Sequence, residues 1–426
     1  MSEVREVDDS VDESSAEPYA GPGRGLWAWA VSRPWWVQVL LVYAAARLFT
    51  TAVFLWVASV QEQNPWTAEH PGYFPYVGFM FDGSWYKNVA ENGYPAQLPV
   101  GADGLVQQNA WAFFPLFPML ARGLMVLTRA PWEVVAPLLA LVLGAGAVLA
   151  IHRTVVRGAP RAVAARPGLP LATVALVSVF PTAAVLQVAY TEALALLLVA
   201  GALLLLLRRD YGWMALVVVA LGFTRAVALP MAVVIVVHAA VRWWSSRRGT
   251  DTFTWRTGAA LAGLALLAAA SGFLWPAICG WVTGVPDAYL QTQEAWRGVR
   301  EVAPFGGWSY VPEFWFKSRA VLVVSLSFAL VIAVLVVPAA WRLGKELHAW
   351  AAAYIVYIAA VVEPGSSLAR FLLLAFPLAA VTAGVVTRPP VARRWWFGAV
   401  VVLMLGLQVL WVRQMWHAGP TGDWPP

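Results

Sequence analysis

The fold class of this chain follows from VQVLLVYAAARLFTTAVFLWVASV, which occupies positions Val37 to Val60. As a helix, this apolar run is long enough to cross the roughly 30 Å hydrocarbon core of a bilayer. Arg47 is its only charge. An arginine inside such a span either faces the protein interior and pairs with an acid or snorkels to the interface, and the sequence leaves both open. We therefore predict a first transmembrane helix here.

The rest of the chain has the same character. Of its 426 residues, 60% are hydrophobic and 12% are charged, and the mean hydropathy is +0.67. Because unsatisfied peptide groups are costly in lipid, apolar runs of roughly 18 to 25 residues are expected to form helices. The 25 Trp and 12 Tyr fit aromatic belts at two interfaces, and the single Cys279 excludes an intramolecular disulfide. The sequence predicts an all-α polytopic membrane protein.

Charge is distributed unevenly along the chain, although its net value is +6. Residues 1–34 begin with an acidic, polar segment that lacks the pattern of a signal peptide, so we predict a disordered cytoplasmic tail. The remainder is basic, in short clusters between apolar runs. This pattern is typical of a protein surrounded by membrane lipids, and it makes nucleic acid a poor partner.

The basic clusters orient the predicted helices, because such clusters stay in the cytoplasm. They lie at 152–166, 208–209, 242–248, 342–348 and 388–394. An even number of crossings must separate neighbouring clusters, so 169–207 and 213–243 are predicted as hairpins, although one long tilted helix also fits 213–243. Further crossings are predicted at 254–278, 320–340, 349–362, 371–386 and 396–412. A full crossing at 111–128 would move every later basic cluster to the extracytoplasmic side. We therefore interpret that run as a re-entrant or interfacial helix.

About eleven crossings result. They divide the chain into the tail 1–34, a transmembrane domain over 35–413 and an extracytoplasmic tail over 414–426. Residues 61–131 are predicted to form the first extracytoplasmic loop, and residues 279–318 a second large one.

Charges at the ends of apolar runs fall on one side of the membrane in this arrangement. They are Asp82, Glu91, Glu192, Arg225, Glu363 and Arg370. Ionisable groups near lipid are costly and usually mark a substrate path or a catalytic centre. We predict that they converge on an extracytoplasmic cavity. Independent structural ion pairs are the alternative.

Several of these residues lie in motifs. FDGSWY at 81–86 continues to NGY at 92–94 and is followed by NAWAFFPLFP at 109–118, YTEAL at 190–194 and Thr224-Arg225. In this order and spacing, the motifs resemble those of the PIG-V-type mannosyltransferases over residues 35–235. One departure is Phe81-Asp82-Gly83, where the family usually has Trp-Asp followed by a bulky or His-containing turn.

The resemblance implies a GT-C glycosyltransferase with about 11 transmembrane helices, an integral multi-pass protein of a bacterial plasma membrane. Such an inverting enzyme moves mannose from a polyprenyl-phosphate sugar donor to a glycan or glycolipid acceptor on the extracytoplasmic face. Displacing polyprenyl phosphate needs a general base, and Asp82 is the candidate. The leaving phosphate needs positive charge, for which Arg225 and Arg370 are the candidates.

The remaining candidates are expected to contact substrate. Glu192 either holds Arg225 or Arg47 in position or binds acceptor hydroxyls. Glu91 lies nine residues after Asp82, near one helix face if the loop is helical, and is either a second carboxylate or a solvated charge. The other candidate contacts are Trp85, Tyr86, Trp111, Tyr190 and Glu363. Trp85, Tyr86 and Trp111 either stack on a sugar ring or anchor the loop at the lipid headgroups.

Cofactor signals are weak. The sequence has no Asp-x-Asp motif, Walker loop or dinucleotide fingerprint, and its five histidines are scattered. We expect no cofactor and no metal site. The main alternative function is a membrane transporter or lipid-linked sugar flippase, in which the charges line a pathway and no bond is made. Another sugar such as arabinose, or a protein hydroxyl as acceptor, also stays open.

Overall fold

The computed structural model describes residues 29, 32–299 and 301–420. Nearly all of the predicted tail 1–34 and the last six residues of the predicted tail 414–426 therefore lie outside the described residues. The described part consists of helices and connecting loops, with a single isolated β-bridge between Val100 and Val106. The predicted all-α class is confirmed.

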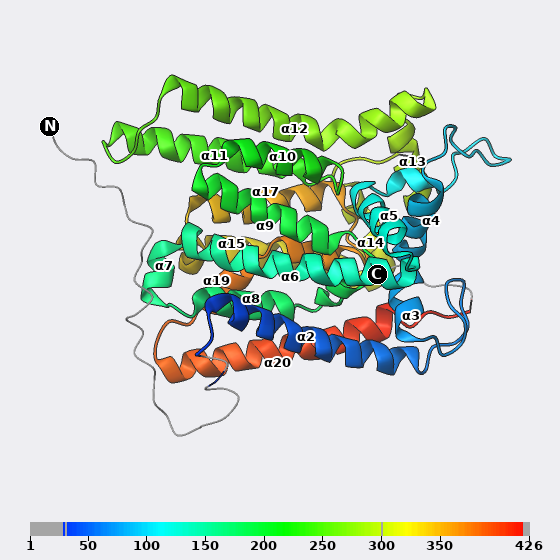
Figure 1. The fold of residues 1–426 in the computed structure, drawn as a ribbon, viewed down its shortest axis with the longest axis horizontal. Coiled ribbons are helices and arrows are strands. Elements are labelled where there is room, and N and C mark those ends of the chain that lie inside the picture. The colour runs from blue at the N-terminus through cyan, green and yellow to red at the C-terminus, as the bar shows by residue number, and fades with distance from the viewer. Residues whose placement is uncertain (1–28, 30–31, 300, 421–426) are drawn as a thin grey trace.

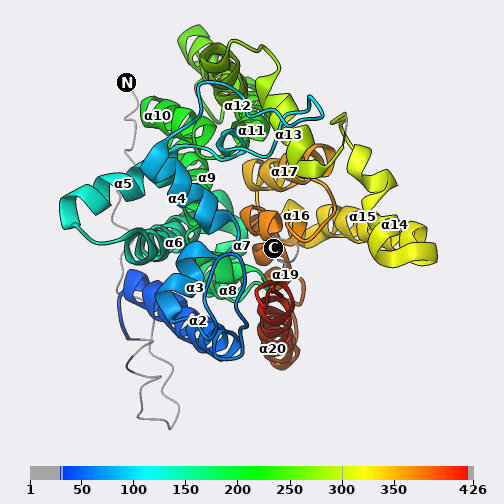
Figure 2. The ribbon, with the colours of Figure 1, turned by 90° about the vertical axis from the view of Figure 1, so that its right-hand side faces the viewer.

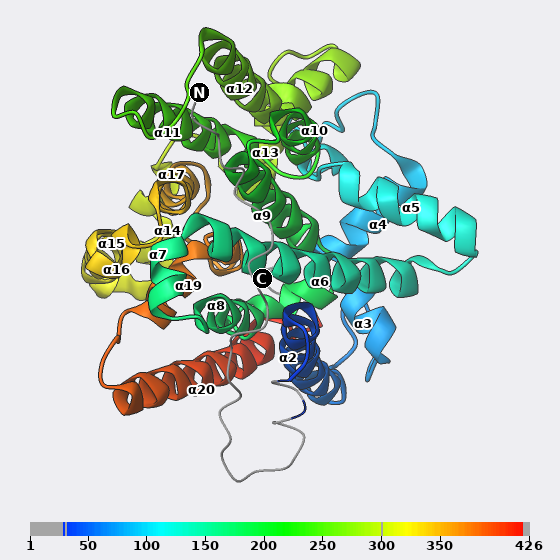
Figure 3. The same cartoon turned by 60° about the vertical axis from the view of Figure 1, so that its left-hand side comes forward.

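Six of the described helical segments are long and apolar enough to cross a membrane, which indicates a membrane protein. They are α2 (Trp35–Ala58), α6 (Trp132–Gly158), α11 (Ala228–Arg247), α12 (Trp255–Thr283), the segment Gly306–Val336 with α15 (Ala320–Val336), and α20 (Pro390–Met415). Figure 1 shows α2, α6, α12 and α20 running along the long axis of the molecule. Figure 3 shows α2 and α20 along one edge and α11 and α12 along the opposite edge.

A helical hairpin occupies 169–207 between these edges. Its arms are α8 (Leu169–Ser178) and α9 (Glu192–Arg208), separated by the 3-10 turn η2 (Ala183–Gln187). Leu207 near the end of α9 lies close to Gly158, shortly before α8 begins, so the chain has turned back on itself. The break falls at the polar segment, as predicted.

Residues 213–243 also fold back on themselves, as α10 (Tyr211–Gly222) and α11. The Tyr211 hydroxyl accepts a hydrogen bond from Arg242 at 2.8 Å and lies 3.2 Å from the His238 ring. In one continuous helix Tyr211 and Arg242 would be roughly 46 Å apart. The alternative of a single tilted helix is therefore wrong.

Arg47 pairs with no acid among the described residues, and its side chain does not snorkel to an interface. Its side chain is buried and donates to the backbone carbonyls of Ser178, the last residue of α8, and Ala183, the first residue of η2. Carbonyls at the C-terminal end of a helix lack partners within that helix and carry partial negative charge, so they can neutralise part of a buried guanidinium. Sequence reasoning missed this because backbone acceptors leave no residue signature.

The predicted crossing at 371–386 is not one helix. It is divided among α18 (Leu368–Phe371), the 3-10 turn η5 (Leu372–Leu374) and α19 (Pro377–Gly384). Pro377 has no backbone N–H for the preceding turn, which favours a break there. The eight residues of α19 extend about 12 Å, too short to cross hydrocarbon alone.

The predicted starts of the second extracytoplasmic loop and of the C-terminal tail also differ from the structure. α12 continues to Thr283, where Gly284 with φ +71° ends it, so the second loop begins later than residue 279. The start of the predicted C-terminal tail packs back on the bundle. Trp416 is fully buried, and Ala418 exchanges two hydrogen bonds with the Gln61 side chain.

Short helices gather at one end of the bundle, on the right in Figure 1. They are α3 (Tyr73–Phe79), α4 (Asp82–Asn92), α5 (Leu116–Thr128), α13 (Ala288–Arg297) and α14 (Val311–Phe316). Figure 2 looks onto this end, where α4 and α5 lie across the view. α17 (Lys345–Val361) packs against α11 and reaches the same end. These elements position the site described next.

Candidate functional site

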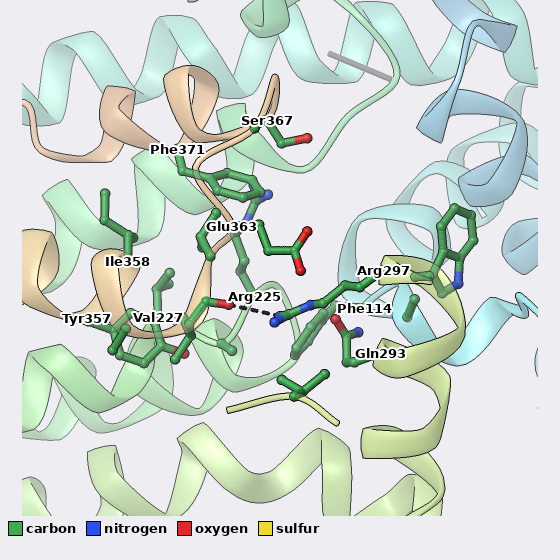
Figure 4. A pocket seen from close by; sticks show the side chains of 18 of the residues that line it. Phe114, Arg225, Val227, Gln293, Arg297, Tyr357, Ile358, Glu363, Ser367 and Phe371 are labelled. Atoms are coloured by element: carbon green, nitrogen blue, oxygen red, sulfur yellow. Dashed lines mark hydrogen bonds between the residues drawn. The ribbon is translucent and has the colours of Figure 1, made fainter. Parts of the chain in front are cut away.

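A cavity of about 720 Å³ opens at the end of the bundle that carries the short helices (Figure 4). Residues far apart in the sequence line it. Its polar lining includes Asp82, Tyr86, Thr191, Thr224, Arg225, Gln293, Arg297, Tyr310, Glu363, Ser367 and Arg370. The cavity therefore collects charges from α4, the α10–α11 turn, α13 and α18 into one place.

Four of the predicted site residues form a continuous ion-pair cluster. Arg370 lies 2.7 Å from Asp82 and 3.2 Å from Glu192, and Glu192 lies 2.8 Å from Arg225. Asp82, Arg225 and Arg370 line the cavity, whereas Glu192 is completely buried and is not part of the lining. Two positive and two negative charges balance within the cluster, which limits the free energy needed to bury them.

Both carboxylates of the ion-pair cluster occupy the first residue of a helix, Asp82 in α4 and Glu192 in α9. The N-terminal end of a helix carries partial positive charge, which stabilises an acidic side chain there. The backbone N–H of Asp82 also donates to the Tyr190 hydroxyl at 3.3 Å. Tyr190 is fully buried and does not line the cavity, so it supports Asp82 from behind.

The backbone around Asp82 is tightly constrained. Phe81 has φ +50°, an unfavourable conformation for a bulky residue, and its ring packs against Trp66 and Trp416. A Cβ atom on Gly83 would lie 2.5 Å from the Gly78 carbonyl oxygen. A bulky residue at this position would push α4 away from α3 and displace the carboxylate.

Aromatic rings hold the two arginines of the cluster. Arg225 lies in the turn between α10 and α11 and stacks over Phe371 at 3.9 Å. Arg370, within α18, lies over Tyr190 at 5.1 Å. Arg225 contacts the Glu192 carboxylate, and its side chain keeps 17% exposure, so it still faces the cavity. Arg370 is engaged by two carboxylates and is 8% exposed.

Tyr86 is the one predicted aromatic contact that lines the cavity. Its hydroxyl lies 3.2 Å from the Thr191 hydroxyl, and burial raises the pKa of Tyr86 well above its ordinary value. The ring therefore stays neutral at physiological pH and presents an O–H group.

The two predicted tryptophan contacts lie outside the lining. Trp85 stacks on Phe113 at 5.6 Å and meets the edge of Trp296. Trp111 is buried and stacks on Tyr94 at 4.7 Å, and its indole N–H donates to the Pro95 carbonyl. Neither is therefore placed as a sugar platform, because neither lines the cavity and each already stacks on another aromatic ring.

Glu91 does not reach the cavity. Its carboxylate is exposed and pairs with Lys87 at 3.9 Å. Nine residues along a helix correspond to a rotation of about 900°, which places Glu91 half a turn away from Asp82. The expectation of a shared face was wrong. Glu363 does line the cavity, where it accepts a hydrogen bond from Tyr310.

Sequence reasoning missed Arg297. This residue ends α13 and lines the cavity, and its Nη2 donates to the Val361 carbonyl at 2.9 Å. Charges are ordinary in a polar loop, so its place within the predicted loop 279–318 gave no signal.

The described residues contain no group of three or more His, Cys, Asp or Glu side chains arranged to hold a metal ion. What the site can do chemically is to place the carboxylates of Asp82 and Glu363, several N–H donors and the neutral Tyr86 phenol around a partly apolar chamber. No protein-family model matches the sequence, and no curated protein matches it significantly.

Proposed function

We propose that this protein is an inverting glycosyltransferase that moves mannose from a polyprenyl-phosphate donor to a glycan or glycolipid. The observation that carries the proposal is the convergence of Asp82, Arg225 and Arg370 on one cavity at the end of a bundle of apolar helices. A transferase acting on a lipid-linked sugar needs a base and cationic groups near the lipid boundary. The resemblance of residues 35–235 to PIG-V-type enzymes supplies the sugar and the donor class.

In the proposed reaction, the acceptor hydroxyl oxygen bonds to the anomeric carbon of the donor sugar. The bond from that carbon to the phosphate oxygen breaks on the opposite face, and its electron pair leaves with polyprenyl phosphate. The hydroxyl proton passes to the Asp82 carboxylate, which acts as general base. Glycoside formation with inversion needs one such base and no covalent enzyme intermediate.

The arginines have different roles in this proposal. Arg370 touches both carboxylates of the ion-pair cluster, so it positions Asp82 rather than binding substrate. Arg225 keeps an exposed edge toward the cavity and stabilises negative charge on the departing phosphate. Glu192 fixes the geometry of both arginines.

The proposed topology is a multi-pass arrangement of about eleven crossings in a bacterial plasma membrane, with the cavity extracytoplasmic. α5 is proposed to lie at the interface, which is supported by its 13 residues and by its direction across the bundle (Figure 2). The basic connection between α11 and α12 lies at the opposite end of the bundle from α13, as the positive-inside rule requires (Figure 1).

The decisive experiment measures polyprenyl phosphate released by the purified protein from polyprenyl-phosphate mannose and a membrane glycan extract. Asp82→Asn is expected to lower turnover by about two orders of magnitude or more, the usual scale for a general base. Glu91→Gln is the matched control, because this carboxylate on the same helix lies outside the cavity. Release by Asp82→Asn at the wild-type rate would remove Asp82 from the mechanism. Absence of release with folded wild-type protein would contradict the proposed activity.

A further inference from the structure

The cavity contains a cation that the ion-pair cluster does not use. Figure 4 shows Arg297 extending from α13 into the cavity near Gln293 and Glu363. The Arg297 guanidinium donates a hydrogen bond to the Val361 carbonyl. No ion pair joins Arg297 to a carboxylate in the part of the chain that the structure describes. A guanidinium has five N–H donors, so one carbonyl leaves donors for a ligand.

Charge balance distinguishes Arg297 from the other two arginines of the cavity. Arg225 and Arg370 are each in contact with a carboxylate of the ion-pair cluster. An anion can reach Arg225 only at its exposed edge, beside the Glu192 carboxylate, and at Arg370 it would compete with two carboxylates. Glu363 is the remaining acid of the lining, and its carboxylate is hydrogen-bonded to the Tyr310 hydroxyl rather than to Arg297. Arg297 is therefore the arginine of the lining that has no carboxylate partner among the described residues, so an anionic ligand can bind it without competing with an acid.

The cavity lining also includes three exposed apolar side chains. Phe273 of α12, Leu290 of α13 and Phe314 of α14 line the cavity with 62%, 44% and 54% of their surface exposed. Apolar side chains exposed on a membrane protein are expected to contact hydrocarbon. An alkyl chain can therefore lie along these three residues while a polar headgroup reaches the cavity.

We propose that Arg297 binds the phosphate headgroup of a lipid whose apolar chain lies along Phe273, Leu290 and Phe314. A planar guanidinium offers paired hydrogen bonds to phosphate oxygens, which a lysine does not reproduce. Because Arg297 has no carboxylate partner among the described residues and lies in a cavity with exposed apolar side chains, the site favours an amphipathic phosphate over a soluble one. The identification of this lipid as the sugar donor rests on the proposed function, whereas the binding site does not.

Binding without turnover tests the site. Farnesyl phosphate is titrated into the purified full-length protein in detergent and followed by tryptophan fluorescence. Arg297→Gln should weaken its binding about ten- to a hundredfold, the scale of one or two charge-assisted hydrogen bonds. Arg122→Gln is the matched control, because Arg122 is an exposed arginine of α5 that does not line the cavity, and it should bind normally. Farnesol should bind weakly and equally to all three proteins.

Two further measurements separate the possible outcomes. Arg297→Lys keeps the positive charge but loses the paired hydrogen bonds of the guanidinium. If this variant folds like wild type and regains only part of the affinity for farnesyl phosphate, the result supports paired hydrogen bonds from Arg297 to the phosphate. Equal affinity of Arg297→Gln and wild type for farnesyl phosphate would overturn the proposal. Inorganic phosphate binding as tightly as farnesyl phosphate would overturn the lipid assignment. If Arg297→Gln loses farnesyl phosphate binding, the lipid-phosphate site is supported even when no glycosyl transfer is found. If transfer is found but Arg297→Gln binds farnesyl phosphate normally, the lipid-phosphate site is refuted and the proposed activity is not.

Discussion

Glu192→Gln removes the charge that joins the two arginines of the ion-pair cluster. The wild-type carboxylate is 1% exposed and lies 2.8 Å from Arg225 and 3.2 Å from Arg370. Without it, Arg370 retains Asp82, whereas Arg225 has no carboxylate within ion-pair distance among the described residues. The substitution therefore leaves an excess positive charge in a largely dehydrated site.

The expected loss follows from the burial of the remaining charge. Breaking a buried ion pair by removing one partner destabilises proteins by about 3 to 5 kcal/mol. Arg225 keeps 17% exposure and stacks on Phe371, so a value near the lower limit, about 3 kcal/mol, is expected here. Arg225→Gln should cost less, because Glu192 then still contacts Arg370. The double variant restores the charge balance and should lose less than the sum of the two single variants.

The measurement is the free energy of unfolding in detergent, obtained by titration with a denaturing detergent and followed by tryptophan fluorescence. All three variants are compared with wild type at one pH, and size-exclusion chromatography checks that each is monodisperse. A Glu192→Gln protein as stable as wild type would refute the idea that Glu192 neutralises buried arginines. Strictly additive losses in the double variant would show that the two side chains are not coupled.

Three other perturbations test different parts of the molecule. In a cysteine-free background, a cysteine at Ser309 should react with an impermeant thiol reagent in intact cells and one at Thr250 should not, and the reverse pattern would invert the proposed orientation. The hydrogen bond from Arg242 lowers the pKa of Asp251 below its ordinary value of 3.8. The ionised Asp251 carboxylate therefore stabilises the fold fully above about pH 4, and this stabilisation is lost as the pH falls through the folded-state pKa. Asp251→Asn should therefore lower stability at neutral pH and remove this acid dependence, as followed by thermal unfolding between pH 3 and 7. Trp416→Ala should lower stability by about 3 to 5 kcal/mol, since this ring is completely buried, and an unchanged unfolding transition would show that the C-terminal segment is not part of the core.

The all-α class and the two central hairpins could be predicted because lipid imposes strong constraints on sequence. A backbone in hydrocarbon must be helical, and polar interruptions such as 187–192 can then lie only at breaks. Breaks that depend on local backbone chemistry were harder to predict. Pro377 interrupts an apolar run whose hydropathy alone resembles that of a crossing helix. The count of crossings stays a prediction.

The candidate site was predictable to the extent that charge near lipid is costly. That cost is why Asp82, Glu192, Arg225 and Arg370 could be grouped before any geometry was known. Which acid pairs with which arginine depends on side-chain positions, and the sequence left Glu192 between Arg225 and Arg47. The structure joins it to Arg225 and Arg370, while the guanidinium of Arg47 donates to backbone carbonyls instead. Arg297 lies in a loop segment, where charge has no such cost and so gives no warning of its position.

Gly83 shows how a departure from a sequence motif can follow from packing rather than from a change of chemistry. The sequence alone shows only that Gly83 follows Asp82, where the PIG-V-type enzymes that the chain resembles usually have a bulky or His-containing turn. In the structure, the missing side chain lets α4 approach the Gly78 carbonyl, where a Cβ atom would lie 2.5 Å from the oxygen. Because Asp82 is the first residue of α4, this close approach helps to place its carboxylate, which lies 2.7 Å from Arg370. In the proposed mechanism, Gly83 therefore helps to position Asp82 as the base.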